Sequence, residues 1–325
     1  MASPPRHLLP LLLLLALLGT SSAAAPGVIR LPRAGACAAP ADPTVYDRPV
    51  IGIVTHPGDG AAGRIDNGTS TSYIGASYVK FVEAGGARVI PLIYNEPDER
   101  LLEKLSLVNG VLFTGGSVKR GPYFETIKKV FQYVLDKNDA GVPFPLFAQC
   151  LGFELVSMIV SKDNNILESF HASDQASTLQ FPNYSSLQGS VFGSCLIEVI
   201  QIRRFHPDLI KKLSTSCLVM QNHKYGISPK RLRENDALSS FFKILTISPD
   251  ENGEVYVSTV EAQKYPITCT QWHPEKAIFE WRKPMIPHSE DAVQVTQIFA
   301  NYFIRFVILS LFVISNTSSA YSHSC

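Results

Sequence analysis

From Pro49 onward, short apolar runs alternate with segments in which apolar residues recur at helical spacing. The strand-like runs are residues 50–54, 87–93, 110–113 and 145–149. The helical patterns are residues 72–83, 97–107, 123–137 and 151–160. Because strands and helices alternate with short connections, this half of the chain predicts a mostly parallel central sheet with helices on both faces.

The second half of the chain alternates less regularly. Residues 241–248 and 254–260 flank a turn-type segment, which predicts an antiparallel hairpin. Another strand is expected over 265–271, and a helix that opens at Ser289 and reaches Tyr302. No internal repeat and no Pro/Ser-rich linker interrupts the chain. The sequence therefore predicts one α/β domain over 49–302, with additional antiparallel strands.

Two terminal segments lie outside this domain. Residues 1–25 combine a basic start, an apolar run and small residues, which is typical of a signal peptide. A membrane anchor is the alternative, but the run is much shorter than the roughly 20 residues of a spanning helix. Residues 303–325 form an atypical apolar tail, in which Arg305 interrupts the apolar residues and the ten apolar-rich residues from Phe306 are too few to span a bilayer. We expect this tail to favour aggregation or to alter a dimer surface.

Composition and charge exclude several classes of protein. With 46% apolar and 18% charged residues, the 325-residue chain can bury a full core and is not disordered. The formal net charge is +1, and no basic block is present, which argues against a nucleic-acid partner. We expect no metal and no other cofactor, and no stable insertion into a membrane.

Entry into the secretory pathway changes how the cysteines and asparagines are interpreted. Sequons at Asn67, Asn183 and Asn316 become candidate glycosylation sites. The six cysteines are scattered without a disulfide-type spacing: Cys37, Cys150, Cys195, Cys217, Cys269 and Cys325. Cys217 and Cys269 each lie in an apolar run, which favours a buried structural thiol. A vacuole, or the extracellular space and cell wall, is the expected location.

Cys150 lies between an expected strand and an expected helix. In an α/β sheet this is the position at which a tight turn presents a nucleophile. The helix that starts at Leu151 directs its N-terminal amides at the sulfur, which predicts a lowered thiol pKa. A buried, inert thiol is the competing interpretation.

His273 and Glu275 supply the expected partners of this thiol. The imidazole can take the thiol proton and return it to a leaving amine. Glu275 follows two positions later, on the same side of an extended segment, and can fix the tautomer of the imidazole. A surface histidine beside a turn proline is the alternative. Cys150, His273 and Glu275 together predict thiol-based acyl transfer.

Acyl transfer also requires donors for the developing oxyanion. Gly115 and Gly116 end a strand, and glycine lets backbone N–H groups approach a substrate closely. The amide of Leu151 is a further candidate donor. A Gly-Gly pair also suits any tight turn.

These motifs resemble those of the gamma-glutamyl hydrolase family in the class I glutamine-amidotransferase-like superfamily, most closely its plant members. The matching stretches are residues 49–53, 73–80, 108–116, 150–154, 221–223 and 271–276. The resemblance implies that the chain cleaves the γ-linked amides of folate poly-γ-glutamate, with Cys150 as nucleophile, His273 as base and acid, and Glu275 as orienting partner. It also implies that Tyr78, Glu154 and His223 bind substrate. Tyr78 reads alternatively as a core aromatic residue.

One internal stretch departs from the family pattern. Residues 193–202 form an apparent insertion of high β-propensity with a single acidic residue, Glu198. We expect it to be dispensable, unless it forms an edge strand against the hairpin after Phe241.

Two further functional classes remain open: a glutaminase that passes ammonia to a synthetase, and a catalytically impaired isoform. The expected partners are the folate substrate and a second copy of the chain in a homodimer, although the sequence does not fix the oligomeric state.

Overall fold

The computed structural model describes residues 49–58, 72–183, 187–197, 200–203 and 205–315, with 194–203 and 308–315 described by their backbone alone. The chain divides into two units, Met1–Pro43 and Thr44–Cys325, and every described residue belongs to the second. The expected signal segment 1–25 lies outside the described residues. So do the sequons of Asn67 and Asn316 and part of the sequon of Asn183.

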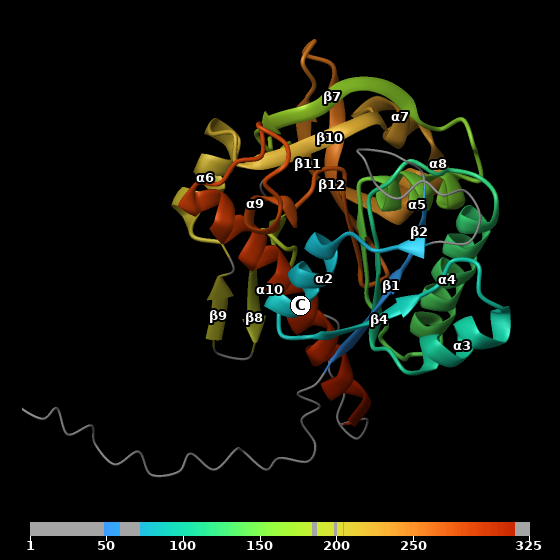
Figure 1. Ribbon diagram of the computed structural model, residues 1–325. Coiled ribbons are helices and arrows are strands. Elements are labelled where there is room, and N and C mark those ends of the chain that lie inside the picture. Colours follow the sequence, from blue (N-terminus) through green and yellow to red (C-terminus); the bar gives the residue numbers. More distant parts are fainter. Residues whose placement is uncertain (1–48, 59–71, 184–186, 198–199, 204, 316–325) are drawn as a thin grey trace, which may run out of the picture. The chain divides into compact units, whose positions relative to one another are not determined.

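A seven-stranded sheet with the order β11-β12-β13-β6-β5-β1-β4 forms the centre (Figure 1). Its strands are β1 (Val50–Val54), β4 (Arg88–Leu92), β5 (Gly110–Phe113), β6 (Leu146–Gln149), β11 (Phe242–Pro249), β12 (Val255–Ala262) and β13 (Ile267–Thr270). The five strands from β13 to β4 are parallel, and β12 and β11 extend the sheet antiparallel. The predicted fold class is confirmed.

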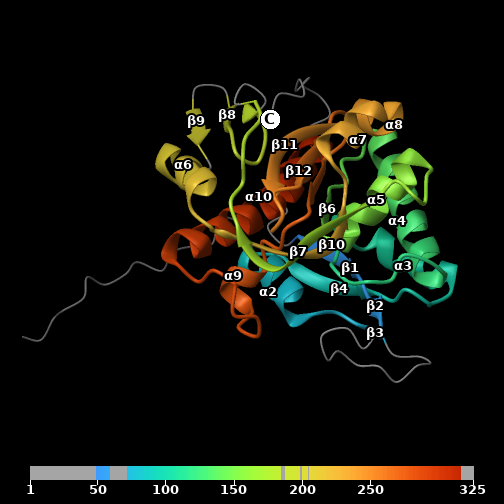
Figure 2. The ribbon, with the colours of Figure 1, turned by 90° about the horizontal axis from the view of Figure 1, so that it is seen from above.

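Helices cover both faces of this sheet (Figure 2). The helices are α2 (Ala76–Ala84), α3 (Asp98–Ser106), α4 (Pro122–Asp139), α5 (Leu151–Ser161), α6 (Pro207–Thr215), α7 (Pro229–Glu234), α8 (Asp236–Phe241), α9 (Lys276–Phe279) and α10 (Glu290–Ser315). Alternate strand residues point to opposite faces. Val50 and Val54 of β1 therefore pack with α3, α4 and α5, whereas Ile51 and Ile53 pack with α2 and α10.

Three two-stranded sheets accompany the central sheet: β7 (Glu168–Ser177) with β10 (Val219–Gly226), β2 (His56–Pro57) with β3 (Ser72–Tyr73), and β8 (Ser194–Ile197) with β9 (Ile200–Arg203). The β7–β10 pair, which the sequence pattern did not predict, is antiparallel and interrupted by irregularities in register. The β2–β3 pair corrects the expected start of the first helix. Because Ser72 and Tyr73 pair with β2, α2 begins only at Ala76.

The apparent insertion folds back on itself. Of the described strands, β8 pairs only with β9 and neither pairs with β11, so the alternative of an edge strand on the hairpin is not formed. The rings of Phe192 and Phe205, which flank the insertion, lie 5.4 Å apart and are buried. The two ends of the insertion therefore start and finish at nearly the same place.

The C-terminal helix does not end at Tyr302, as the sequence pattern suggested. Helix α10 continues to Ser315, and Phe303, Ile304 and Val307 are buried against the core. A methyl group added at Gly85, which ends α2, would lie 2.5 Å from Ile304 Cγ1 and 2.7 Å from the Ala300 carbonyl oxygen. The start of the expected tail is thus part of the core. Within the described part of the chain, no helix is both long and apolar enough to cross a membrane.

Candidate active site

Cys150 occupies a sharp turn between β6 and α5. Its φ of 51° and ψ of −107° are unusual for a residue with a side chain, and its own amide donates to the Thr270 carbonyl at 2.7 Å. A methyl group at Gly152 would lie 2.8 Å from the Phe113 carbonyl oxygen, so only glycine allows α5 to start this close to β5. The turn therefore holds the thiol at the carboxyl ends of β6 and β13.

His273 follows β13 and is fixed from two directions. Its amide donates to the Met220 carbonyl of β10 at 2.9 Å, and its Nδ1 lies 2.8 Å from Glu275 Oε1. Both side chains are buried. His273 Nε2 is buried as well and has no hydrogen-bond partner among the described residues. The imidazole therefore has one nitrogen held by a carboxylate and one nitrogen left open.

Gly115 is the point at which the site residues converge. A methyl group there would lie 2.6 Å from Tyr78 Oη, 2.9 Å from His273 Cε1 and 3.4 Å from Cys150 Cβ. The Gly115 amide, an expected oxyanion donor, already donates to Tyr78 Oη at 2.9 Å. The Leu151 amide belongs to the first turn of α5, where amides have no acceptor within the helix.

Gly116, the other half of the pair, is confined by His56. A methyl group at Gly116 would lie 2.2 Å from His56 Nε2, and the Ser117 amide donates to this nitrogen at 3.3 Å. His56 of β2 thus supports the loop that carries both glycines.

Burial dominates the chemistry of the thiol. It raises the pKa of Cys150 far above the ordinary value of a thiol, and the carboxylate of Glu154 raises it further. The ammonium of Lys119 acts in the opposite direction. The expected lowering of the thiol pKa is therefore wrong, because burial disfavours the charged thiolate. In the resting site the thiol keeps its proton.

The three residues assigned to substrate binding lie in this buried region. Tyr78 Oη contacts Gly115, and burial raises the pKa of the phenol, so it stays protonated. Burial also lowers the pKa of His223 to about 3, so that its ring, 4.6 Å from the ring of Tyr256, is neutral. Glu154 Oε1 accepts from Gln271 Nε2 at 3.3 Å.

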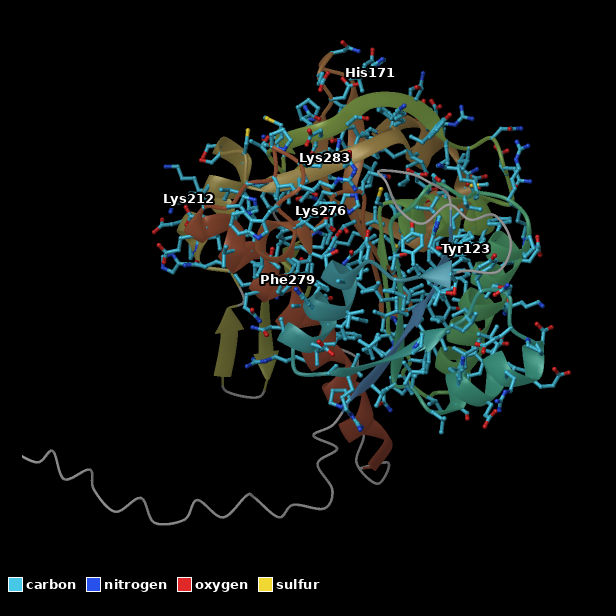
Figure 3. The ribbon with its side chains drawn as sticks, viewed as in Figure 1. Tyr123, His171, Lys212, Lys276, Phe279 and Lys283 are labelled. Carbon is cyan, nitrogen blue, oxygen red and sulfur yellow. The ribbon has the colours of Figure 1, made fainter. Side chains whose placement is uncertain are left out.

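Sequence reasoning missed Lys119, whose Nζ lies 2.7 Å from Glu154 Oε2. A basic residue shortly after the Gly115-Gly116 pair was the available signal. It also missed a role for the ammonium of Lys276, whose Nζ lies 3.7 Å from Glu275 Oε1. Lys276 also contacts Glu280, and Lys283 Nζ lies 3.9 Å from Asp174 Oδ2 of β7; both lysines are labelled in Figure 3.

Cys217 lies away from this site, and the expectation that it is buried is wrong. It sits just after α6, with an exposed side chain, whereas Cys269 of β13 is buried as expected. No group of three His, Cys, Asp or Glu side chains within the described ranges could hold a metal ion.

The chain is similar to one peptidase family and to γ-glutamyl hydrolases of two plants. Residues 49–275 match the Peptidase C26 family. Gamma-glutamyl hydrolase 1 of Arabidopsis thaliana is 58% identical over 272 residues, which cover 84% of this chain and 75% of that protein. Gamma-glutamyl hydrolase 2 of the same plant is 57% identical with the same coverage. The gamma-glutamyl hydrolase of Glycine max is 53% identical over 264 residues, 81% of this chain and 74% of that one.

Proposed function

This chain belongs to the peptidase C26 family of γ-glutamyl hydrolases, and from that premise we propose that it cleaves the γ-linked amides of folate poly-γ-glutamate through a thioester on Cys150. One observation carries the mechanism: Cys150 and His273 both approach Gly115, and the open Nε2 of His273 lies on the ring opposite the nitrogen bound by Glu275.

In the first half of the reaction, His273 Nε2 takes the thiol proton as Cys150 Sγ attacks the γ-carbonyl carbon. The C–N bond then breaks, and His273 returns the proton to the nitrogen of the leaving glutamyl amine. In the second half, His273 takes a proton from water, and the resulting hydroxide attacks the thioester carbon. The C–S bond then breaks, the glutamyl γ-carboxylate is released, and His273 returns the proton to Cys150 Sγ. Glu275 stabilises the imidazolium in both halves.

The oxyanion is stabilised by the Leu151 amide and by Tyr78. Because Tyr78 Oη accepts from the Gly115 amide, its own hydrogen remains available for donation. Its raised pKa keeps that hydrogen in place. Gly115 therefore acts through Tyr78 in this arrangement, and Gly116 keeps the loop in contact with His56.

The decisive experiment compares Cys150→Ala with Cys217→Ser, a change at an exposed thiol outside the site. Release of glutamate from folate pentaglutamate should fall by at least a thousandfold in Cys150→Ala and stay within twofold of the parent in Cys217→Ser. Glutamine is assayed in parallel. Turnover of Cys150→Ala within tenfold of the parent would remove Cys150 as nucleophile, and faster hydrolysis of glutamine than of the folate would favour a glutaminase.

We further propose that the protein enters the secretory pathway, reaches the vacuole or the extracellular space as a glycoprotein, and acts as a homodimer. The apolar segment 8–18 supports entry into the secretory pathway, and the sequon at Asn183 supports glycosylation. N-terminal sequencing of the mature protein, glycosidase treatment and light scattering test the three parts separately. A mature chain that retains residues 1–25 would contradict the first.

A further inference from the structure

Lys119 and Glu154 form an ion pair beside the nucleophile that the mechanism above does not use. Lys119 Nζ lies 2.7 Å from Glu154 Oε2, and Glu154 is one helical turn along α5 from Cys150. The two side chains differ in exposure: 4% for Glu154 and 23% for Lys119. The carboxylate is therefore buried, while the ammonium lies at the boundary between the site and solvent.

The surroundings of Lys119 hold the ammonium in place while leaving part of its bonding capacity open. Its Nζ lies 4.6 Å from the centre of the Tyr225 ring, and Tyr225 is itself 46% exposed. An ammonium has three N–H donors, and the ion pair with Glu154 does not use all three. The charge of Lys119 also acts on the thiol of Cys150 and on the ring of His223. It is thus a positioned cation within electrostatic range of both.

The substrate class offers a matching anion at a matching distance. Every residue of a poly-γ-glutamate carries a free α-carboxylate, four carbon–carbon bonds from its γ-carbonyl carbon. At about 1.5 Å a bond, this separation is about 5 Å in an extended chain, close to the rise of one helical turn. A glutamyl residue that lies along α5 with its γ-carbonyl at Cys150 would therefore place its own α-carboxylate at the level of Glu154, the ion-pair partner of Lys119.

We propose that Lys119 binds the α-carboxylate of the glutamyl residue whose γ-carbonyl is attacked by Cys150. Glu154 holds the ammonium in place and accepts the amide N–H on the same residue. This inference rests on the proposed function and adds the group that distinguishes γ-glutamyl chains from other amides. Lysine is suited to this role because the ammonium can share its donors between two carboxylates.

A binding experiment tests the pair directly, without requiring turnover. Cys150→Ala is titrated with a γ-glutamyl dipeptide amide that has either a free α-carboxylate or an α-carboxamide on its first residue. The acid should bind at least tenfold more tightly than the carboxamide. Adding Lys119→Gln should weaken the binding of the acid by about tenfold and change the binding of the carboxamide by less than twofold. The double variant should therefore have no preference for the acid.

Two control variants separate binding from a structural effect. Lys128→Gln removes an exposed lysine of α4 that lies 3.8 Å from Glu125, and it should retain the preference for the acid. Lys119→Arg keeps the charge and should retain most of the preference, with an unfolding temperature close to that of the parent. This variant also keeps the test informative if Lys119→Gln does not fold, since loss of the preference in folded Lys119→Arg would contradict the inference.

Equal binding of acid and carboxamide by Cys150→Ala would overturn the inference, as would an undiminished preference in Lys119→Gln. Failure of the proposed function gives a different result: the parent enzyme would cleave no γ-glutamyl substrate, whatever the ligand preference of Cys150→Ala.

Discussion

The imidazole ring of His273 is held through Nδ1, because Glu275 accepts from this nitrogen while Nε2 has no partner among the described residues. Replacing Glu275 with Gln keeps a hydrogen-bonding oxygen but removes the charge that stabilises the imidazolium. We expect Glu275→Gln to lower kcat by about ten- to a hundredfold and His273→Ala by a thousandfold or more. Steady-state kinetics with folate pentaglutamate measures both. An equal loss in the two variants would assign Glu275 a more direct part in the reaction.

The two thiols Cys150 and Cys217 should differ in reactivity. Burial raises the pKa of Cys150, so its thiolate is scarce near neutral pH, whereas Cys217 is exposed. We expect iodoacetamide to alkylate Cys217 at least tenfold faster than Cys150 at pH 7 without substrate, and the rate at Cys150 to go on rising with pH above 9. Mass spectrometry of the two peptides gives both rates. A plateau for Cys150 below pH 7 would show that the thiolate is stabilised after all.

The sequence could predict that Cys150 and His273 lie close together, but not the ion pair beside them. Cys150 and His273 each end a strand, and parallel strands end at one edge of a sheet, so their proximity follows from the pattern. The pair of Lys119 and Glu154 joins a loop to a helix, and no periodicity encodes such a contact. The direction of the pKa shift of Cys150 was predicted wrongly for the same reason. Burial of the thiol depends on residues distant in sequence, such as Asn222, whose carbonyl oxygen lies 4.0 Å from the sulfur.

At the scale of elements, the hairpin of β8 and β9 is the segment that should be removable. It pairs only with itself among the described strands, and Phe192 and Phe205 at its ends are already in contact. Replacing residues 194–203 by two glycines should leave kcat within twofold and raise the unfolding temperature by a few degrees, because a shorter loop costs less entropy to close. Calorimetry measures the change. A drop of several degrees would show that the hairpin stabilises the fold.

Elements with strong patterns were predicted well, and those that depend on partners were not. Strands β1 and β5 were predicted to the residue, because continuous apolar runs between turn residues have few alternatives. Strands β7 and β10 carry polar residues on both faces and are defined by their pairing with each other. Helix α10 extends beyond Tyr302, its predicted end, because Gly85 at the end of α2 packs against Ile304.

At the scale of the whole molecule, the buried His223 should make stability depend on pH. Burial lowers its pKa to about 3, and the charges of His273 and Lys119 act in the same direction. In the unfolded chain the pKa of a histidine is about 6.5. A lowered pKa contributes stability that is fully present above pH 6.5 and is lost as the pH falls toward 3. The loss at pH 4.5 is on the order of 2–3 kcal/mol, since the unfolded chain takes up the proton first.

His223→Gln isolates this effect, because glutamine keeps hydrogen-bonding capacity but does not titrate. Between pH 7 and pH 4.5, the free energy of unfolding should fall by about 2 kcal/mol less in the variant than in the parent. Urea denaturation at the two pH values gives the free energy of unfolding of each protein. Subtracting the change in the variant from the change in the parent removes the effect of all groups that titrate equally in both. Equal losses would mean that His223 takes up its proton within the folded state.

The contact between Gly85 and α10 has a consequence for proteins that differ from this one only near the C-terminus. Helix α2 carries Tyr78 and ends at Gly85, against which Ala300 and Ile304 are packed without space for a methyl group. Two proteins that share every catalytic residue but differ in sequence after Tyr302 would therefore differ in what packs against α2, the helix that carries Tyr78. A change of sequence after Tyr302 would in this way alter turnover without changing any residue that touches substrate.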